Sequence, residues 1–265
     1  ENSPESKVLV IASDIAKYGV GTPGEPTQGA GSVAMLITQN PRIMAFNNDN
    51  VAQTRDIMDF WRPNYSSTPY VNGMYSTQQY LDCLTTTWDE YKKRYDWTMD
   101  DFAAICFHLP YPKLALKGLR KMMDKTLSKE KQNSLQENFD KSILYSQMIG
   151  NIYTGSLFLG LLSLLENAET LKAGDKIALY SYGSGAVSEF FSGELVEGYE
   201  AYLDKERLSK LKQRTALSVA DYEKVFFEEV QLDESGSAQF AGYEYQDYAL
   251  VEIVDHQRRY SKVEK

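Results

Sequence analysis

His108 is the residue of this sequence with the clearest potential for chemistry. It stands at the end of a short, largely apolar run, residues 103–109, which is closed by Pro110 and predicts a buried strand. Catalytic groups of α/β proteins often project from the ends of such strands. A histidine in this position is, by itself, more often a hydrogen-bonded core residue than a catalyst. The choice between these two interpretations therefore depends on the residues around it in the sequence.

Cys106 lies two positions before His108 and therefore on the same face of the predicted strand. A nucleophilic cysteine–histidine pair is conceivable, but side chains two residues apart on a strand are separated by roughly 6–7 Å. That distance is too great for direct activation of the thiol. We therefore expect Cys106 to be a small, buried apolar side chain.

A row of cations follows the histidine. Lysines recur at every fourth position, with Arg120 beside them: Lys113, Lys117, Lys121 and Lys125. On a helix this spacing forms one basic stripe that starts a single turn after His108. A charged stripe is usually just a solvated helix face, but beside a candidate catalytic residue in an acidic protein it predicts an anionic substrate that carries phosphate.

Two short motifs offer further polar groups. In residues 150–156, Asn151 is either part of a capped helix start, with Thr154, or a donor that stabilises a developing charge or orients a histidine. In residues 181–185, Ser184 belongs either to a tight turn or to a backbone-amide site for an anion. It does not fit a G-x-S-x-G nucleophile elbow, because no glycine stands two residues before it.

A glycine-rich segment, residues 19–31, follows the first predicted strand. Residues 19–24 match G-x-G-x-x-G, but a dinucleotide site needs a helix to start there, and the prolines at 23 and 26 with a following strand predict an irregular loop instead. Tyr18 and Thr27 flank this loop and could reach a ligand. Nothing in the spacing of Asp14, Glu25 and Asp59 pairs these carboxylates for acid–base work.

Composition limits the class of protein. The chain has 265 residues, 43% of them hydrophobic and 25% charged, which excludes disorder, collagen-like repeats and a coiled coil. A net charge of −9 argues against general nucleic-acid binding. Two cysteines and two histidines provide neither a disulfide framework nor zinc-ligand spacing. The most apolar stretch, residues 157–165, is too short for a membrane span, and no signal peptide precedes it.

Predicted elements alternate between strands and helices, which indicates an α/β class. The helix at 154–165 is apolar nearly all round, so we expect the protein to enclose it on every side. The first strand is expected to be buried, and because the chain opens without Met we expect it to begin within a longer protein. The predicted strands are 7–13, 32–37, 103–109, 176–182 with a hairpin partner at 186–196, and 243–254; the predicted helices are 77–96, 114–127, 132–148, 154–165 and 218–230, the last opened by a capping box of Ser218 and Asp221.

Taken together and in order, six segments of this chain resemble hydroxymethylglutaryl-CoA (HMG-CoA) synthases of the bacterial type. Several motifs in series are more specific than any one of them, and the resemblance runs essentially from end to end. The segments are Asp-Ile-Ala-Lys-Tyr-Gly at 14–19, Gly-Glu-Pro-Thr-Gln-Gly-Ala-Gly at 24–31, Asp-Phe-Trp-Arg-Pro at 59–63, Phe-His-Leu-Pro-Tyr at 107–111, Gly-Asn-Ile-Tyr-Thr-Gly-Ser at 150–156 and Ser-Tyr-Gly-Ser-Gly at 181–185.

The resemblance implies a fold and an activity. The fold is thiolase-like, with layers in the order α/β/α/β/α, here truncated at the N-terminus: residues 1–42 would be a remnant of the N-terminal half and residues 43–265 the C-terminal half with insertions. The activity is an acyl transfer of the mevalonate pathway of isoprenoid biosynthesis, in which acetyl-CoA condenses with acetoacetyl-CoA through an acetyl-cysteine enzyme to give HMG-CoA and CoA. It also implies a cytoplasmic homodimer that uses CoA thioesters as substrates, with no cofactor, metal, nucleic acid or membrane.

Motif by motif, the resemblance assigns roles to residues. His108 and Asn151 would be catalytic at the carbonyl of the second substrate, and Lys113 and Lys117 would bind the CoA phosphates or pantetheine. Asp14, Asp59 and Gly183 would support the site. The remaining substrate contacts would be Tyr18, Thr27, Ser76, Tyr153 and Ser184.

Two departures from the family pattern stand out. The family's nucleophilic cysteine and its glutamate base lie upstream of anything that matches Lys7, and neither Cys83 nor Cys106 occupies that context, so we expect the chain as given to be unable to form the acetyl-enzyme. Asn72 stands where relatives usually carry Asp. Two alternatives remain: another condensing enzyme of the thiolase fold, of the ketoacyl synthase type, and an inactive fragment that binds CoA or a partner.

Overall fold

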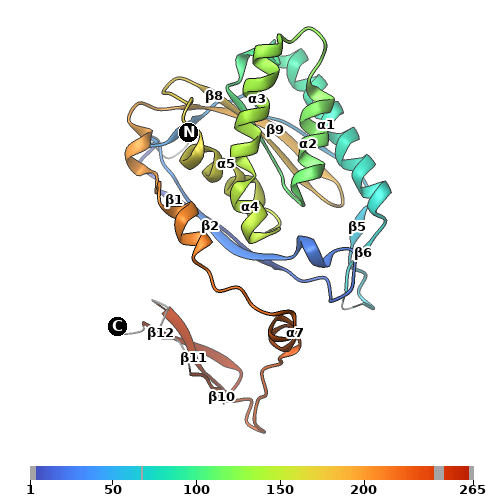
Figure 1. Cartoon of the computed structure of the whole chain (residues 1–265), viewed down its shortest axis with the longest axis vertical. Coiled ribbons are helices and arrows are strands. Elements are labelled where there is room, and N and C mark those ends of the chain that lie inside the picture. The colour runs from blue at the N-terminus through green and yellow to red at the C-terminus, as the bar shows by residue number, and fades with distance from the viewer. Residues whose placement is uncertain (1–3, 67, 242–247, 263–265) are drawn as a thin grey trace. The chain divides into compact units, whose positions relative to one another are not determined.

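The computed structural model describes residues 4–66, 68–241 and 248–262 (Figure 1). The chain divides into two compact units, residues 1–214 and 215–265, and all of the predicted site residues lie in the first. The predicted boundary between residues 42 and 43 concerns the two halves of a thiolase fold rather than these units, and it stays a prediction.

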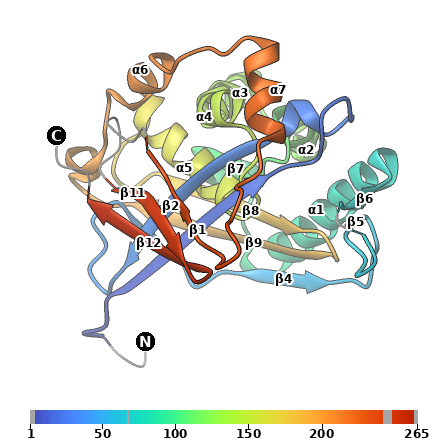
Figure 2. The ribbon, with the colours of Figure 1, turned by 90° about the horizontal axis from the view of Figure 1, so that it is seen from below.

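A mixed sheet of five strands forms the centre of the first unit (Figure 2). Its hydrogen-bonded order is β3–β9–β8–β7, and β4 also pairs with β9. β7 and β8 are parallel, whereas the other pairs are antiparallel. The predicted strands at 103–109 and 176–182 and the hairpin partner at 186–196 are thereby confirmed. The strands are β3 (Met44–Phe46), β4 (Val51–Thr54), β7 (Ala104–Phe107), β8 (Lys176–Gly183) and β9 (Val187–Leu195).

Alternating side chains of β7 divide the core into two layers. Ile105 and Phe107 pack with residues of helices α1, α2 and α3. Ala104 and Cys106 point to the other face and pack against α5, where Cys106 is fully buried, as predicted. The bounds of these helices are α1 (Gly73–Tyr95), α2 (Pro112–Met122), α3 (Lys129–Ser142) and α5 (Gly155–Asn167).

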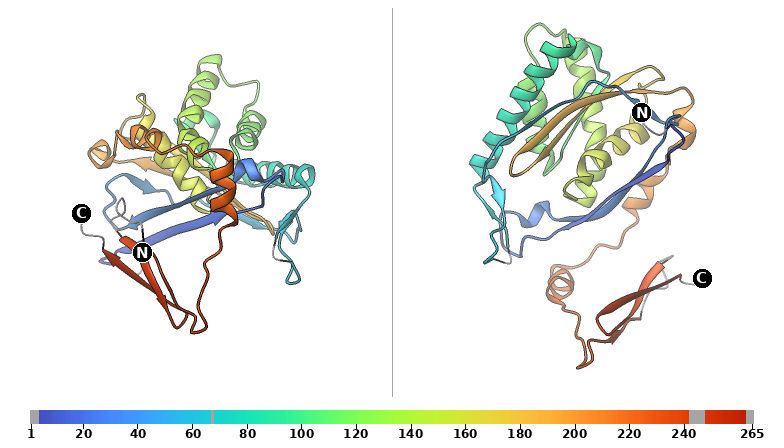
Figure 3. Two further views of the ribbon diagram at one scale, coloured as in Figure 1. Left: turned by 60° about the horizontal axis from the view of Figure 1, so that its bottom comes forward. Right: turned by 180° about the vertical axis from the view of Figure 1, so that it is seen from behind.

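Helix α5 is enclosed, as its apolar sequence predicted. None of its residues is classed as exposed, and it contacts β7 and β8 on one side and the strand pair β1–β2 on another (Figure 3). Gly160 permits the close approach, because a Cβ there would lie 3.1 Å from Cδ1 of Leu109. The helix thereby fixes the distance between the central sheet and the segments that flank it.

The helix predicted at 132–148 is divided into α3 and α4 (Leu144–Ile149). The reason is a side chain of α5: the Ser163 hydroxyl donates to the carbonyl of Lys141 at 2.6 Å and accepts from the backbone N–H of Tyr145 at 3.4 Å. In a continuous helix these two backbone groups would bond each other. The inserted hydroxyl therefore separates the two helices, an effect that one-dimensional periodicity does not contain.

Helix α2 ends at Met122, five residues before the predicted end at 127. The Asp124 carboxylate accepts from both the backbone N–H and the hydroxyl of Thr126, which closes a turn directly after the helix. Lys125 therefore lies outside the helix, and the predicted four-lysine stripe is wrong in its last member. Lys113, Lys117 and Lys121 remain on one exposed face.

Strands β1 (Val8–Ala16) and β2 (Gly29–Ile37) pair antiparallel along their whole length, from Val8 with Ile37 to Ala16 with Gly29. The prediction that the first strand is buried is wrong in this structure: Leu9 is 60% exposed and Ile15 70%. Among the described residues, α5 and α4 cover part of this pair. An apolar run predicts a strand that needs cover, but it does not say what supplies that cover.

The first unit also contains shorter elements around this framework. A hairpin of two short strands precedes α1, and a helical segment follows β9. Their bounds are β5 (Phe60–Trp61), β6 (Tyr70–Val71), α6 (Arg207–Lys212), and the 3₁₀ helices η1 (Glu25–Thr27), η2 (Met99–Asp101) and η3 (Tyr199–Tyr202). Within the described residues, no helix combines the length and apolarity that a membrane crossing requires.

The second unit contains helix α7 (Val219–Phe227) and a three-stranded antiparallel sheet. The Ser218 side chain caps α7 by accepting from the backbone N–H of Asp221, as predicted, although the helix ends three residues before the predicted Val230. Of the strand predicted at 243–254, residues 243–247 lie outside the described residues and the rest is β11. The strands are β10 (Ala238–Gln239), β11 (Tyr248–Val254) and β12 (Gln257–Lys262).

Candidate active site

His108 directly follows β7, and two neighbouring elements hold its backbone. Its N–H donates to the carbonyl of Tyr180 in β8 at 2.7 Å, and its carbonyl accepts from the Tyr80 hydroxyl of α1 at 3.0 Å. The imidazole is half-buried, and burial lowers the pKa of His108 to about 4. At neutral pH the ring is therefore uncharged and keeps one N–H donor and one nitrogen acceptor.

Asn151, between α4 and α5, has a side-chain amide with a fixed orientation. Its carbonyl oxygen accepts from the backbone N–H of Tyr153 at 2.9 Å and from the Ser156 hydroxyl at 3.0 Å. The amide nitrogen consequently points the other way and donates to the Tyr18 hydroxyl at 3.2 Å. Because that nitrogen carries two hydrogens, a second N–H remains to be donated. The side chain is thus built to offer donors.

Two glycines bring the loop before β2 against this asparagine. A Cβ on Gly150 would lie 1.9 Å from the carbonyl oxygen of Gln28, and one on Gly29 would lie 2.6 Å from that of Asn151. The backbone N–H of Asn151 donates to the carbonyl of Thr27 at 3.0 Å. Gly150 also has a φ of 87°, which side chains disfavour. Glycine at both positions therefore lets Thr27 and Asn151 stand side by side.

Tyr18 and Tyr153 form an aromatic pair beside the Asn151 amide. Their rings meet edge to face at 6.4 Å between centroids. Burial and the Tyr18 hydroxyl raise the pKa of Tyr153 well above its usual value, and the charge of Asp14 contributes in the same direction. Tyr153 is therefore a neutral hydrogen-bonding group. The side chain of Asp14 itself is exposed and accepts from the N–H of Ile15.

Asp59 holds the turn that follows β8. Its fully buried carboxylate accepts from the Tyr182 hydroxyl at 2.7 Å, the Ser184 hydroxyl at 3.1 Å and the backbone N–H of Gly185 at 3.2 Å. The Ser184 hydroxyl thus donates its hydrogen to Asp59, and its oxygen can still accept a hydrogen bond. Gly183 is exposed, and a Cβ there would meet nothing within 4 Å, so close packing does not require glycine at that position.

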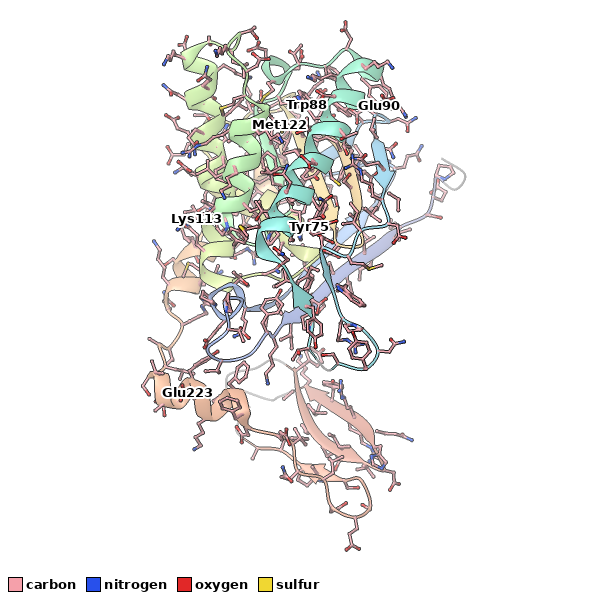
Figure 4. All side chains as sticks on the ribbon, turned by 90° about the vertical axis from the view of Figure 1, so that its right-hand side faces the viewer. Tyr75, Trp88, Glu90, Lys113, Met122 and Glu223 are labelled. Carbon is pink, nitrogen blue, oxygen red and sulfur yellow. The ribbon has the colours of Figure 1, made fainter. Side chains whose placement is uncertain are left out.

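Ser76 and Lys113 lie in the first turns of α1 and α2, respectively. Figure 4 shows Tyr75 and Lys113 at one end of this helix pair and Trp88 and Met122 at the other. Asn72 caps α1 by accepting from the N–H of Tyr75 at 3.1 Å. Asn and Asp are equally good in that role, so Asn72 preserves the helix start that carries Ser76.

One lysine on the basic face of α2 is in an ion pair with another helix. Lys121 pairs with Asp82 of α1 at 3.7 Å, whereas Lys113 and Lys117 are exposed near the start of the helix. Pro112 occupies the first turn, and Tyr111 provides no side-chain cap. This end of α2 therefore combines two cations with backbone N–H groups, an arrangement that favours anions.

A cavity of about 340 Å³ adjoins these groups. Its walls come from the η1 loop, the segment after His108, α4 and Asn151, and no charged side chain lines it. The lining residues are Pro26, Thr27, Gln28, Leu109, Pro110, Tyr111, Pro112, Ser146, Gln147, Met148, Ile149, Gly150 and Asn151. A second hollow, about 460 Å³, lies by the ends of β3 and β9 and contains none of the predicted site residues.

Sequence reasoning missed two residues that organise the site. The Gln28 side-chain oxygen accepts from the backbone N–H of Tyr18 at 2.7 Å and of Gly19 at 3.2 Å, which holds Tyr18 over the loop. Ser156 lies in the first turn of α5, and its hydroxyl orients the Asn151 amide by donating to the amide oxygen. Both belong to the motifs already singled out. No group of three metal-ligating side chains is found in the part of the chain that the structure describes.

A mixed sheet with an enclosed helix against it, and with His and Asn loops at its edge, defines the thiolase-like class. A crystal structure of an HMG-CoA synthase complexed with CoA matches 99% of this chain and 68% of its own, with a TM-score of 0.94 and 65% identity. A structure of MvaS in complex with 3-hydroxy-3-methylglutaryl coenzyme A matches with a TM-score of 0.78 and 30% identity, over 97% of this chain and 67% of its own. These matches confirm the predicted fold class.

Sequence comparison assigns the family. The model of the hydroxymethylglutaryl-coenzyme A synthase C-terminal region matches residues 50–142 and 119–259. The hydroxymethylglutaryl-CoA synthase of Enterococcus faecalis is 52% identical over 232 residues, which are 87% of this chain and 60% of that protein. The chain belongs to the hydroxymethylglutaryl-CoA synthase family, as its motifs predicted. It spans about 60% of the length of this curated relative.

Proposed function

We propose that the protein carrying this chain condenses acetyl-CoA with acetoacetyl-CoA and consumes one water to give HMG-CoA and CoA, as an acyltransferase of the mevalonate pathway. The observation that carries the proposal is the fixed Asn151 amide, which keeps one N–H to stabilise negative charge in a member of this family. The ketoacyl synthase alternative is not favoured, because the family model and the relatives named above are HMG-CoA synthases.

His108 would act at the ketone of acetoacetyl-CoA. When the enolate carbon of the acetyl group attacks the ketone carbon, a carbon–carbon bond forms and the ketone oxygen becomes an alkoxide. A neutral imidazole, which the low pKa of about 4 ensures, polarises that oxygen through its N–H and supplies the proton as the alkoxide forms. Water then hydrolyses the thioester that still joins the product to the enzyme thiol. This step restores the thiol, releases HMG-CoA as a carboxylate and frees a proton that returns to the ring.

Asn151 would act at a thioester carbonyl. Its amide nitrogen is directed by two hydrogen bonds on the opposite oxygen, so no reorganisation is needed when the carbonyl oxygen gains charge. The rings of Tyr18 and Tyr153 would complete the wall around the acyl groups. Ser76, Thr27 and Ser184 would make further contacts with substrate, and Asp14, Asp59 and Gly183 would support them.

Neither cysteine of the chain is suited to carry the acetyl group. Cys83 and Cys106 are both fully buried, and burial raises the pKa of the Cys106 thiol to about 12. A thiolate is therefore not formed at either position near neutral pH. We propose that a thiol other than these two forms the acetyl-enzyme.

The CoA moiety would lie along the start of α2. Lys113 and Lys117 would bind its phosphates, and the uncharged cavity would hold its pantetheine arm. We further propose a cytoplasmic homodimer that needs no cofactor beyond its CoA thioester substrates and binds neither nucleic acid nor membrane. The oligomer and the location rest on the family resemblance alone.

The test is to supply the complete gene product with acetyl-CoA alone and with acetyl-CoA plus acetoacetyl-CoA, and to measure release of the CoA thiol. We expect fast release only with both substrates, with HMG-CoA as the product. If CoA binds but no thiol is released under either condition, the proposal of condensation is wrong and the inactive CoA-binding alternative is favoured.

A further inference from the structure

Ser146, in α4, carries a buried hydroxyl whose hydrogen-bonding capacity the protein leaves unused. The residue is 5% exposed, and its Oγ is the only buried side-chain nitrogen or oxygen without a hydrogen-bond partner among the described residues. Such a group costs free energy and therefore needs an explanation. The other buried serines described all have partners: Ser142, Ser156, Ser163, Ser188 and Ser192.

The position of Ser146 supplies an explanation, because the residue lines the cavity of about 340 Å³ beside Asn151. The Ser146 carbonyl also accepts from the backbone N–H of Gly150, the residue before Asn151. Ser146 is therefore tied to the loop that presents the Asn151 amide. A ligand in this cavity would meet both residues.

The chemistry of the cavity walls restricts that ligand. No charged side chain lines the cavity, whereas the cations Lys113 and Lys117 lie on α2, whose first turn forms one wall. A phosphate would be stabilised at α2 and not inside the cavity. The interior suits a neutral chain with amide groups, because a serine hydroxyl both donates and accepts.

We propose that the Ser146 hydroxyl hydrogen-bonds an amide of the pantetheine arm and thereby holds that arm in the cavity that Asn151 also lines. Serine side chains occupy staggered rotamers, so the hydroxyl can change direction without movement of the backbone. Ser146 is thus a substrate-positioning residue, a role that the motif comparison does not assign to it. The inference rests on the proposed function, since it requires a CoA thioester in the cavity.

The test uses the complete gene product and three probes: acetoacetyl-CoA as substrate, pantetheine as an inhibitor with the amides only, and adenosine 3′,5′-bisphosphate as an inhibitor with the phosphates only. Ser146→Ala should raise the KM for acetoacetyl-CoA and the inhibition constant of pantetheine about three- to tenfold, which is the effect of one hydrogen bond. It should leave kcat and the inhibition constant of the bisphosphate unchanged.

Two matched variants separate this role from a structural one. Lys113→Ala should show the reverse pattern, with weaker binding of the bisphosphate and unchanged binding of pantetheine. Ser142→Ala, one turn earlier, removes a hydroxyl that donates to the Phe139 carbonyl and does not line the cavity, so it should lower the melting temperature without changing either constant. Ser146→Ala, in contrast, should not lower the melting temperature.

Unchanged KM and pantetheine inhibition in Ser146→Ala would overturn the proposal, and a lowered melting temperature with unchanged constants would show that the hydroxyl instead binds a structural water. If the wild-type protein forms HMG-CoA and Ser146→Ala has the same KM and pantetheine inhibition constant as the wild type, only this inference fails. If the wild-type protein binds neither acetoacetyl-CoA nor pantetheine, the proposed function fails and this inference fails with it.

Discussion

Asn151 and Asp59 are both buried polar side chains next to the candidate active site, yet the protein satisfies them in opposite ways. Three donors surround the Asp59 carboxylate: two hydroxyls and a backbone N–H. Asn151 accepts two hydrogen bonds on its oxygen and donates one from its nitrogen to the Tyr18 hydroxyl, so one hydrogen of that nitrogen remains to be donated. The difference fits the proposed roles, in which Asp59 supports the site and Asn151 presents a donor to the substrate.

Among the variants that test this comparison, Asn151→Asp should have the largest effect on activity. Aspartate keeps the oxygen that accepts from Tyr153 and Ser156 but places an acceptor where the amide donated. Condensation should fall by about 10²–10³ in kcat, the usual cost of removing one donor at a developing oxyanion. Steady-state kinetics of the complete gene product measure this, and a kcat within threefold of wild type would contradict the presenting role.

Asp59→Ala should mainly affect stability. It leaves the hydroxyls of Tyr182 and Ser184 and the N–H of Gly185 without their buried acceptor, which should lower the free energy of unfolding by about 3 kcal/mol. Activity should also fall, because Ser184 loses its orientation. Urea unfolding measures the first effect, and Ser184→Ala is the control: it should reproduce only the loss of activity. Unchanged stability of Asp59→Ala would show that these bonds do not support the fold.

The pH dependence of stability tests the environment of His108. The pKa of His108 is about 4 in the folded protein, below the ordinary value of about 6.5, because folding favours the neutral ring. The contribution of this neutral ring to the free energy of unfolding is therefore complete above pH 6.5 and is lost as the pH falls toward 4. The loss should reach about 2 kcal/mol at pH 5. Unfolding of wild type and His108→Gln over this range measures it, and identical pH dependences would exclude a buried, neutral His108.

The smallest effect should come from Ser156→Ala, which removes one of the two donors that orient the Asn151 amide. We expect about a tenfold loss of kcat, or about 1.4 kcal/mol, with KM unchanged. Ser163→Ala is the matched control, because that hydroxyl is also buried on α5 but bonds the Lys141 carbonyl instead. An equal loss of kcat in both variants would mean that α5 affects the site through packing rather than through Asn151.

The sequence was sufficient for the enclosed helix, for strands β7, β8 and β9 of the central sheet and, through the family motifs, for naming Thr27 and Asn151 as site residues. It did not predict the short strands β3 and β4 of the same sheet. It was insufficient wherever a distant side chain decides the outcome. The break between α3 and α4 depends on the Ser163 hydroxyl, which lies far along the chain. The exposure of β1 depends on what covers it, and the roles of Gln28 and Ser156 depend on hydrogen bonds that no periodicity encodes.

The most direct test of the central claim, that this site performs the condensation, is to measure the two half-reactions separately in His108→Ala. Transfer of a labelled acetyl group from acetyl-CoA to the complete gene product reports the first, and formation of HMG-CoA on addition of acetoacetyl-CoA reports the second. We predict that condensation falls by at least about 10²-fold while acetylation stays largely intact, because a general acid at the ketone acts only in the second step. An equal loss of both half-reactions would contradict this division of roles.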